Sequence, residues 1–224
     1  MKKFWFEWLK PMLVVLLVTG AFRSAIADWN DVPTGSMKPT ILEGDRIFVN
    51  KIAYDLKVPF TTIRIARWDD PQRGDIVVLY SPYDGKRLVK RAVGIPGDTI
   101  ELHNNLLYVN GKRSDYSAAD PQATEFIPLE ELPESRFMTE GTAGRKHAVM
   151  LTPWKPSVRD FAAVRVPPGC YFMMGDNRDD SFDSRMFGFV HRSQILGRAT
   201  VVVASLDPGH HFIPRWHRFF SKLL

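Results

Sequence analysis

The apolar stretch at residues 4–22 constrains the fold most, because it sets the start of the chain apart as a membrane segment. Glu7 and Lys10 interrupt it, and the uninterrupted run at residues 11–22 is too short to cross a bilayer. As a helix, the full stretch of about 19 residues extends roughly 28 Å, which suffices if the long side chains at its start reach the headgroups. We therefore expect one transmembrane anchor within residues 1–27 and a separate body at residues 28–224.

Basic residues around the anchor predict its orientation. Lys2, Lys3 and Lys10 precede the apolar run, and only Arg23 follows closely after it. The positive-inside rule then places the N-terminus in the cytoplasm and the body outside.

A cleavable secretory signal is the alternative for this stretch. Two lysines, a short apolar run and the small-x-small sequence at residues 25–27 fit that pattern. Arg23, between the apolar run and the cleavage site, and Glu7, near the start, do not fit it. We expect an uncleaved anchor, and both interpretations place the body outside the cytoplasm.

The body is predicted to be mainly β. Residues 46–49, 75–80 and 198–203 are rich in β-branched side chains and are bounded by turn residues. Residues 99–102 and 106–109 flank Asn104-Asn105, a pair typical of tight hairpin turns. This pattern favours a twisted antiparallel sheet or barrel with few helices.

Two further segments have a different character. In residues 114–163 the apolar periodicity weakens and Pro, Glu and Ser become frequent, which predicts a small cap inserted into the sheet domain. Residues 215–224 place their apolar side chains on one helical face and Arg218 and Lys222 on another. They are expected to form a short interfacial helix on the membrane or to pack on the protein's own sheet.

The composition argues against several classes of function. The single cysteine, Cys170, excludes an internal disulfide and any multi-cysteine metal site. The six histidines show no metal-binding spacing, so we expect no metal and no cofactor. The formal net charge of +5 suits an anionic membrane surface better than nucleic acid, because no basic run is interleaved with aromatic residues.

Ser36 and Lys90 are the candidate reactive side chains. Ser36 follows Gly35, which permits close backbone approach, and a serine becomes a good nucleophile when a neighbour takes its proton. A buried lysine can take that proton, because burial lowers its pKa. Strand alternation places Lys90 on one face with Leu88 and Ala92. The local sequence alone equally allows a turn serine and a solvated lysine.

Three short segments, which follow one another in a set order along the chain, favour the catalytic interpretation of Ser36 and Lys90. They are Gly-Ser-Met-x-Pro-Thr at residues 35–40, Lys-Arg-Ala-Val-Gly at residues 90–94, and Gly-Asp-Asn-Arg-Asp-x-Ser-x-Asp-Ser-Arg at residues 175–185. Together, just after an anchor, they resemble the bacterial type I signal peptidase family. The resemblance covers the anchor and most of the β body, and residues 114–163 carry none of its motifs.

The resemblance implies a role for each catalytic residue. Ser36 is the expected nucleophile and Lys90 its general base. The Thr34 hydroxyl and the Ser36 backbone N–H are expected to form the oxyanion hole; the family often has serine at the first position, and threonine keeps the donor.

The resemblance also implies supporting residues. Ser181 is expected to hydrogen-bond the Lys90 amine, Asp183 and Arg185 to form an ion pair, and Gly175 to leave room for the lysine. Small substrate side chains are expected in shallow pockets lined by Val32, Met37, Ile41, Leu88 and Val89. At the variable position of the first motif stands Lys38, which is expected to alter substrate preference.

The function implied is that of a membrane-bound endopeptidase that removes signal peptides after a small-x-small sequence. Its partners are then preproteins that bear signal peptides, together with membrane lipids, and its place is the inner (cytoplasmic) membrane of a bacterium with the catalytic domain on the outer side. No cofactor and no nucleic acid are implied. The rivals are a dedicated peptidase for one pilin or conjugation substrate, and a catalytically silent, anchored peptide-binding protein.

Two other interpretations of the third segment stay open. Its four aspartates suggest calcium, but the spacing lacks the glycine and the distal glutamate of an EF-hand loop. A triad of Ser36, His191 and Asp183 is conceivable, because triads are defined by geometry and not by order in the chain.

Overall fold

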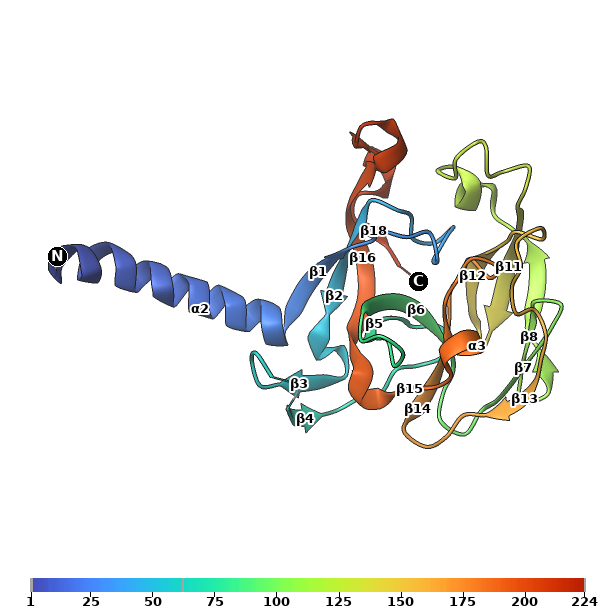
Figure 1. Cartoon of the computed structure of the whole chain (residues 1–224), viewed down its shortest axis with the longest axis horizontal. Coiled ribbons are helices and arrows are strands. Elements are labelled where there is room, and N and C mark those ends of the chain that lie inside the picture. Colours follow the sequence, from blue (N-terminus) through green and yellow to red (C-terminus); the bar gives the residue numbers. More distant parts are fainter. Residues whose placement is uncertain (1, 62, 224) are drawn as a thin grey trace.

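A computed structural model describes residues 2–61 and 63–223. The N-terminal segment is one continuous helical rod, composed of α1 (Lys2–Phe4), a π-helical turn η1 (Trp5–Leu9) and α2 (Lys10–Ala25). The 21 residues Trp5–Ala25 are long and apolar enough to cross a membrane, and only Ala25 at their end is buried in the protein. Figure 1 shows the rod projecting away from the body. The predicted N-terminal apolar helix is confirmed.

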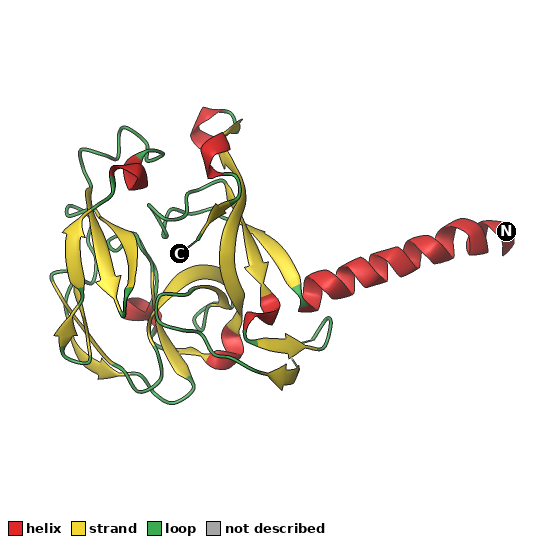
Figure 2. Cartoon of the chain, turned by 180° about the vertical axis from the view of Figure 1, so that it is seen from behind, coloured by secondary structure: helices red, strands yellow, loops and turns green. Residues whose placement is uncertain are grey.

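The body is built on a nine-stranded antiparallel sheet with the order β1-β2-β16-β5-β6-β14-β15, in which β17 and β18 also pair with β16. The strands are β1 (Ala27–Asp31), β2 (Asp45–Asn50), β5 (Ile76–Tyr80), β6 (Arg87–Gly94), β14 (Cys170–Met174), β15 (Val190–His191), β16 (Ile195–Asp207), β17 (Ile213–Pro214) and β18 (Ser221–Lys222). Register shifts in β16 let this 13-residue strand bend and pair with several partners along its length. The sheet curls into a half-barrel (Figures 1 and 2).

Three smaller sheets surround the main one. Their orders are β10-β11-β12, β13-β7-β8-β9 and β3-β4. The strands are β3 (Asp55–Lys57), β4 (Arg64–Arg67), β7 (Thr99–His103), β8 (Leu106–Val109), β9 (Lys112–Arg113), β10 (Asp115–Ala118), β11 (Arg136–Thr142), β12 (Arg145–Leu151) and β13 (Phe161–Arg165). The remaining helical turns are η2 (Lys51–Ala53), η3 (Pro121–Thr124), α3 (Ser184–Phe187), η4 (Arg192–Gln194), η5 (Pro208–His210) and η6 (Trp216–Arg218).

The predicted strands and the predicted hairpin are confirmed. Asn104 and Asn105 adopt φ angles of 49° and 64°, the left-handed conformation that a tight turn between β7 and β8 requires. Residues 114–163 contain the three-stranded sheet β10-β11-β12 and η3, and their last residues belong to β13, which pairs with β7.

The hydrophobic core consists of three clusters that follow the sheets. One packs β2, β5 and β16 around Ile47 and Val78 under the loop that follows β1, and a second packs β5, β6 and β14. The third joins β6 and β14 to β7 and β8. The core therefore holds the strands that bear Lys90 and the loop that bears Ser36 in one rigid body.

The expected amphipathic helix at residues 215–224 is wrong. Residues Trp216–Arg218 form one short 3-10 turn, Phe220 adopts a φ of 59°, and β18 pairs with β16. Backbone carbonyls of β16 accept hydrogen bonds from this segment; one of them is Val202 O, to which the Phe220 N–H donates. Leu223 packs against the core. The alternative, packing on the protein's own sheet, is what the structure shows.

Candidate active site

Ser36 lies on the loop between β1 and β2, and buried neighbours hold that loop in place. Met37 and Ile41 lie fully within the core, so the loop is anchored immediately after the serine. Gly35 has no room for a side chain, because a Cβ there would lie 2.8 Å from Glu43 Oε1 and 2.9 Å from Lys38 Cε. The loop therefore presents the Ser36 hydroxyl from a packed and defined backbone.

Lys90 reaches this hydroxyl from β6. Its side chain is 2% exposed, and Nζ donates a hydrogen bond of 2.6 Å to Ser36 Oγ. Burial lowers the pKa of Lys90 to about 8, because the charged ammonium loses its hydration; Asp183 opposes this shift and Arg185 adds to it. An amine with this pKa is partly neutral near physiological pH, which a proton acceptor for serine requires.

Asp183 lies near the Lys90 amine and is the acceptor of a buried hydrogen-bond network. It accepts hydrogen bonds from the Arg185 guanidinium at 2.8 and 2.9 Å, from the Ser181 hydroxyl at 2.7 Å and from the Gly175 N–H at 3.0 Å. Burial by itself raises the pKa of Asp183, but the hydrogen bonds and charge of Arg185 outweigh it and keep the pKa low. The expected ion pair between Asp183 and Arg185 is present.

Ser181 and Gly175 lie where the third segment meets the serine loop. The Ser181 hydroxyl donates to Asp183 at 2.7 Å, and among the described residues it makes no hydrogen bond with the Lys90 amine, so the expected contact is absent. A Cβ at Gly175 would lie 2.3 Å from both Ser181 Oγ and the Ser36 carbonyl oxygen. The glycine therefore leaves room for Ser181 and for the backbone of the serine loop.

The sequence analysis missed two residues of the third segment that hold the serine loop. The Asn177 N–H donates to Ser36 O at 3.2 Å, and its side chain donates to Gly35 O at 3.2 Å. Asp176 accepts two hydrogen bonds from buried Arg91, at 2.8 and 2.7 Å, and one from Thr40 at the end of the loop. Their place in the third segment, directly after Gly175, was the available signal.

Buried ion pairs also connect the active-site loops to the β10-β11-β12 sheet and its loops. Lys38 is 5% exposed, and its amine lies 2.8 Å from both Glu43 and Glu131, the latter on the loop after η3. Arg178, which follows Asn177, makes two hydrogen bonds of 2.7 and 2.8 Å with Glu140 on β11. Lys38 therefore serves as a structural clamp beside the serine.

The residues expected to line substrate pockets surround the serine loop and β6. Val32, Met37 and Ile41 are buried in the core cluster under the loop, whereas Leu88 and Val89 are half-buried on β6. Thr34 is exposed two residues before the serine.

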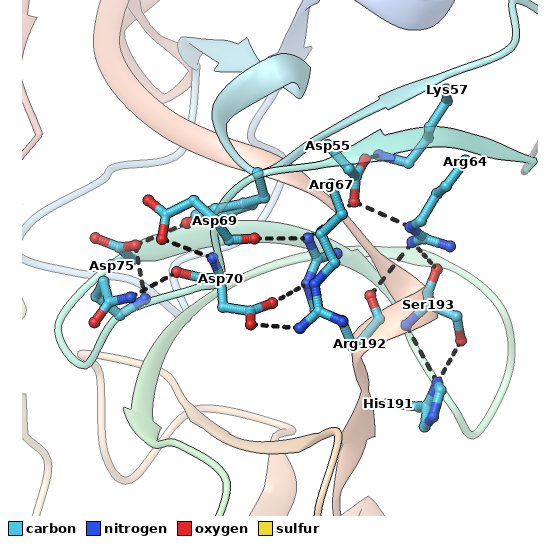
Figure 3. Close-up of polar contacts among 12 residues, drawn as sticks. Asp55, Lys57, Arg64, Arg67, Asp69, Asp70, Asp75, His191, Arg192 and Ser193 are labelled. Atoms are coloured by element: carbon cyan, nitrogen blue, oxygen red, sulfur yellow. Dashed lines mark hydrogen bonds and ion pairs between the residues drawn. The ribbon is translucent and has the colours of Figure 1, made fainter.

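The alternatives for the third segment lose their basis in the structure. His191 is exposed on β15 and hydrogen-bonds Ser193 (Figure 3), while the Asp183 oxygens are occupied by Arg185, Ser181 and Gly175, so no triad forms. Asp176, Asp179 and Asp183 each pair with a different arginine. Among the described residues, no group of three or more His, Cys, Asp or Glu side chains is arranged to hold a metal ion.

Comparison with known proteins identifies the family of this chain. A family model described as signal peptidase, peptidase S26, matches residues 5–204. Signal peptidase I of Pseudomonas aeruginosa is 33% identical over 229 residues, which cover 95% of this chain and 77% of that protein. Signal peptidase I P of Bacillus subtilis subsp. natto is 34% identical over 206 residues, 92% of each chain. A crystal structure of a signal peptidase I from Enterococcus faecalis aligns with 58% of this chain and 97% of its own, with 31% identity and a TM-score of 0.36. The chain belongs to the signal peptidase family, peptidase S26.

Proposed function

We propose that this chain is a membrane-anchored serine endopeptidase that removes signal peptides from preproteins, with Ser36 as nucleophile and Lys90 as general base. The observation that carries the assignment is the 2.6 Å contact between the Ser36 hydroxyl and a buried amine whose pKa is lowered to about 8. A lysine that only stabilised the fold would be expected to pair with a carboxylate, as Lys38 does.

Acylation begins when neutral Lys90 accepts the Ser36 proton as Oγ attacks the carbonyl carbon of the scissile bond. The developing oxyanion is stabilised by the Ser36 N–H and the Thr34 hydroxyl. The Lys90 ammonium then donates its proton to the leaving amine, which departs as the new N-terminus of the mature protein. The signal peptide remains as an ester on Ser36.

Deacylation repeats these steps with water. Neutral Lys90 takes a proton from a water molecule, which attacks the ester carbonyl, and the ammonium returns a proton to Ser36 Oγ. The signal peptide leaves with a free carboxylate. The negative charge of Asp183, which is paired with Arg185, limits how far burial lowers the pKa of Lys90.

The substrate is expected to bind as an extended strand, with a small-x-small sequence before the scissile bond. On β6 the half-buried Leu88 lies on the same face as Lys90 and Val89 on the opposite face, while Val32, Met37 and Ile41 lie below the serine loop. No cofactor takes part.

The test is incubation of the purified full chain with a preprotein that carries an Ala-x-Ala site. We expect cleavage after the second alanine by the wild-type chain and none by Ser36→Ala. Intact substrate with the wild-type chain contradicts the assignment and favours the silent binder. Cleavage of only one among several unrelated preproteins identifies a dedicated peptidase.

The anchor places this chemistry at a membrane, which we propose to be the inner membrane of a bacterium with the body on the outer side. Lys2, Lys3 and Lys10 on the N-terminal side support this orientation. Protease added to the outer face should digest the chain after Arg23 and spare residues 1–10. A body that is protected until the cells are lysed contradicts it.

A further inference from the structure

A cavity of about 850 Å³ lies where the anchor helix meets the body, between the end of α2 and the hairpin formed by β3 and β4. The hairpin comprises residues 55–67, and its position beside the anchor is visible in Figure 1. Five of the described residues that line the cavity are basic, and one, Asp28, is acidic. The basic residues are Arg23, Lys51, Lys57, Arg64 and Arg87.

The carboxylates here are outnumbered by their basic partners. Asp28 is shared by Arg23 at 2.9 Å, Lys51 at 3.2 Å and Arg87 at 3.6 Å. Burial by itself raises the pKa of Asp28, but hydrogen bonds from Arg23 and Lys51 outweigh it, so the pKa is lowered and the group is ionised at neutral pH. One negative charge thus faces three positive charges.

Basic groups also outnumber carboxylates on the hairpin. Asp55 is 1% exposed and is shared by three basic groups, with Arg64 at 3.0 Å and Arg192 at 2.9 Å, and Lys57 as the third. Arg192 also pairs with Asp70 at 3.0 Å and does not line the cavity, whereas Lys57 and Arg64 do. Figure 3 shows Arg64 between Asp55 and the backbone of Ser193, to whose carbonyl it donates at 2.9 Å. The cavity therefore carries an excess of positive charge that an anion would balance.

The hairpin contacts α2 within the last turns of that helix. The Phe60 N–H donates to Ser24 Oγ at 2.7 Å, and a Cβ placed on Gly20 would lie 3.2 Å from the Phe60 ring. Gly20 is five residues before the last residue of α2, which is about 7.5 Å along the axis. Since the 21-residue span is about as long as the hydrocarbon core is thick, a span that ends at Ala25 would place Phe60 just inside the acyl-chain region.

The side chains of the hairpin agree with that depth. Phe60, Ile63 and Ile65 are 67%, 64% and 64% exposed, with Phe60 in the left-handed region at a φ of 62°. Basic side chains next to exposed apolar ones are typical of protein surfaces at the headgroup boundary.

We propose that this cavity binds the phosphate of an anionic phospholipid, whose acyl chains lie along Phe60 and Ile63 beside α2. The occupant is a lipid and not a soluble anion, because the cavity is continuous with the membrane-spanning helix and its apolar rim lies at acyl-chain depth. The bound lipid joins the anchor, the hairpin, η4 and β16, and so fixes the tilt of the body over the bilayer.

The first test measures lipid retained by the full chain in detergent that contains equal amounts of phosphatidylglycerol and phosphatidylcholine, using native mass spectrometry. We expect phosphatidylglycerol to be retained preferentially. Arg64→Gln should reduce its retention about fivefold, since one basic residue at an anionic lipid contributes on the order of 1 kcal/mol. Lys57 and Arg192 still neutralise Asp55 in this variant, so the ion pairs that hold the start of the hairpin remain.

Arg67→Gln is the matched control, because Arg67 lies on the same strand, pairs with Asp70 and does not line the cavity. It should retain lipid and cleave substrate as the wild type does. Equal retention by Arg64→Gln and wild type, or an equal loss in Arg67→Gln, overturns the proposal. Loss of the lipid in excess inorganic phosphate shows a soluble-anion site and also overturns it.

The second test measures depth and does not depend on cleavage activity. A spin label at Ile63→Cys, in a Cys170→Ser background, should be accessible to oxygen from the acyl-chain region of phosphatidylglycerol vesicles. The same label at Trp154→Cys, which is 61% exposed in the described part of the β12–β13 connection, should report water. A label at position 63 that reports water as well contradicts the proposed depth.

Discussion

Replacing Lys90 with methionine should abolish cleavage and at the same time stabilise the protein at neutral pH. The two side chains have similar length and volume, so the variant removes the charge without opening a cavity. In the wild-type protein the Lys90 amine is held in a site where only 2% of the residue is exposed, so its charged form lacks hydration. Loss of the amine removes the only base that we propose for Ser36.

The magnitude follows from the pKa of Lys90, which is about 8 in the folded protein against 10.5 for the ordinary group. Below pH 8 the unfolded chain binds the proton more tightly than the folded one, which costs the folded state about 3 kcal/mol at about pH 7. As pH rises through this window the cost declines, to less than about 1 kcal/mol at about pH 10. Methionine forfeits the hydrogen bond to Ser36, worth about 1 kcal/mol, so the net gain at neutral pH is on the order of 2 kcal/mol.

The assay is thermal unfolding of the full chain in detergent at neutral pH and near pH 10. A gain of this size corresponds to a rise in Tm of about 4–8 °C at neutral pH for a domain of this length, and the rise should shrink toward zero in alkali. Ser36→Ala is the control: it is equally inactive, but it keeps the buried amine and therefore the pH dependence of wild type.

Two results would refute the reasoning. Substantial cleavage by Lys90→Met removes the proposed dyad. A Tm below that of wild type at neutral pH, in a folded variant, shows that the amine is not held at a cost in the folded state.

Three further predictions concern the rate, the serine loop and the anchor. The rate should rise about tenfold from about pH 7 to about pH 9 and level off, because neutral Lys90 is the active form and its pKa is about 8; a pH–rate profile with an acid maximum would instead indicate a carboxylate. Gly175→Ala should lower kcat/KM about 100-fold, since the new methyl group displaces the Ser36 backbone; near-normal kcat/KM in steady-state assays would show that the loop tolerates the shift. Membrane-derived protein should keep its N-terminus, because Ala27 pairs with Asn50 within β1 and β2 and this pairing must open before the bond after Ala27 can enter the active site of another molecule. A slow cut there in concentrated detergent, absent in Ser36→Ala, is expected, whereas N-terminal sequencing that finds mainly Asp28 would reveal a removable signal.

Much of the fold is encoded in local patterns, and these were predictable from the sequence. A continuous apolar stretch specifies the anchor whatever the body does, because the bilayer requires only length and hydrophobicity. Alternation and β-branched residues specify β2, β5 and β16, and Asn104-Asn105 favours the left-handed turn that closes β7 and β8. The residues of the site were identified by the order of three short segments, although none of them shows its chemistry locally.

Contacts between distant residues were decided only by the tertiary structure. The amine of Lys90 meets a hydroxyl 54 residues away, and its pKa depends on burial by side chains from several strands, which no local pattern specifies. The partner of the Ser181 hydroxyl is Asp183, and only the folded loop brings these two groups within hydrogen-bond distance. Lys38 is buried because its amine forms an ion pair with Glu131, which is 93 residues away in the sequence. The end of the chain became β18 because β16 offered unpaired backbone groups, and hydrogen bonds to an existing sheet edge outweigh an amphipathic helical pattern that is too short to be stable alone.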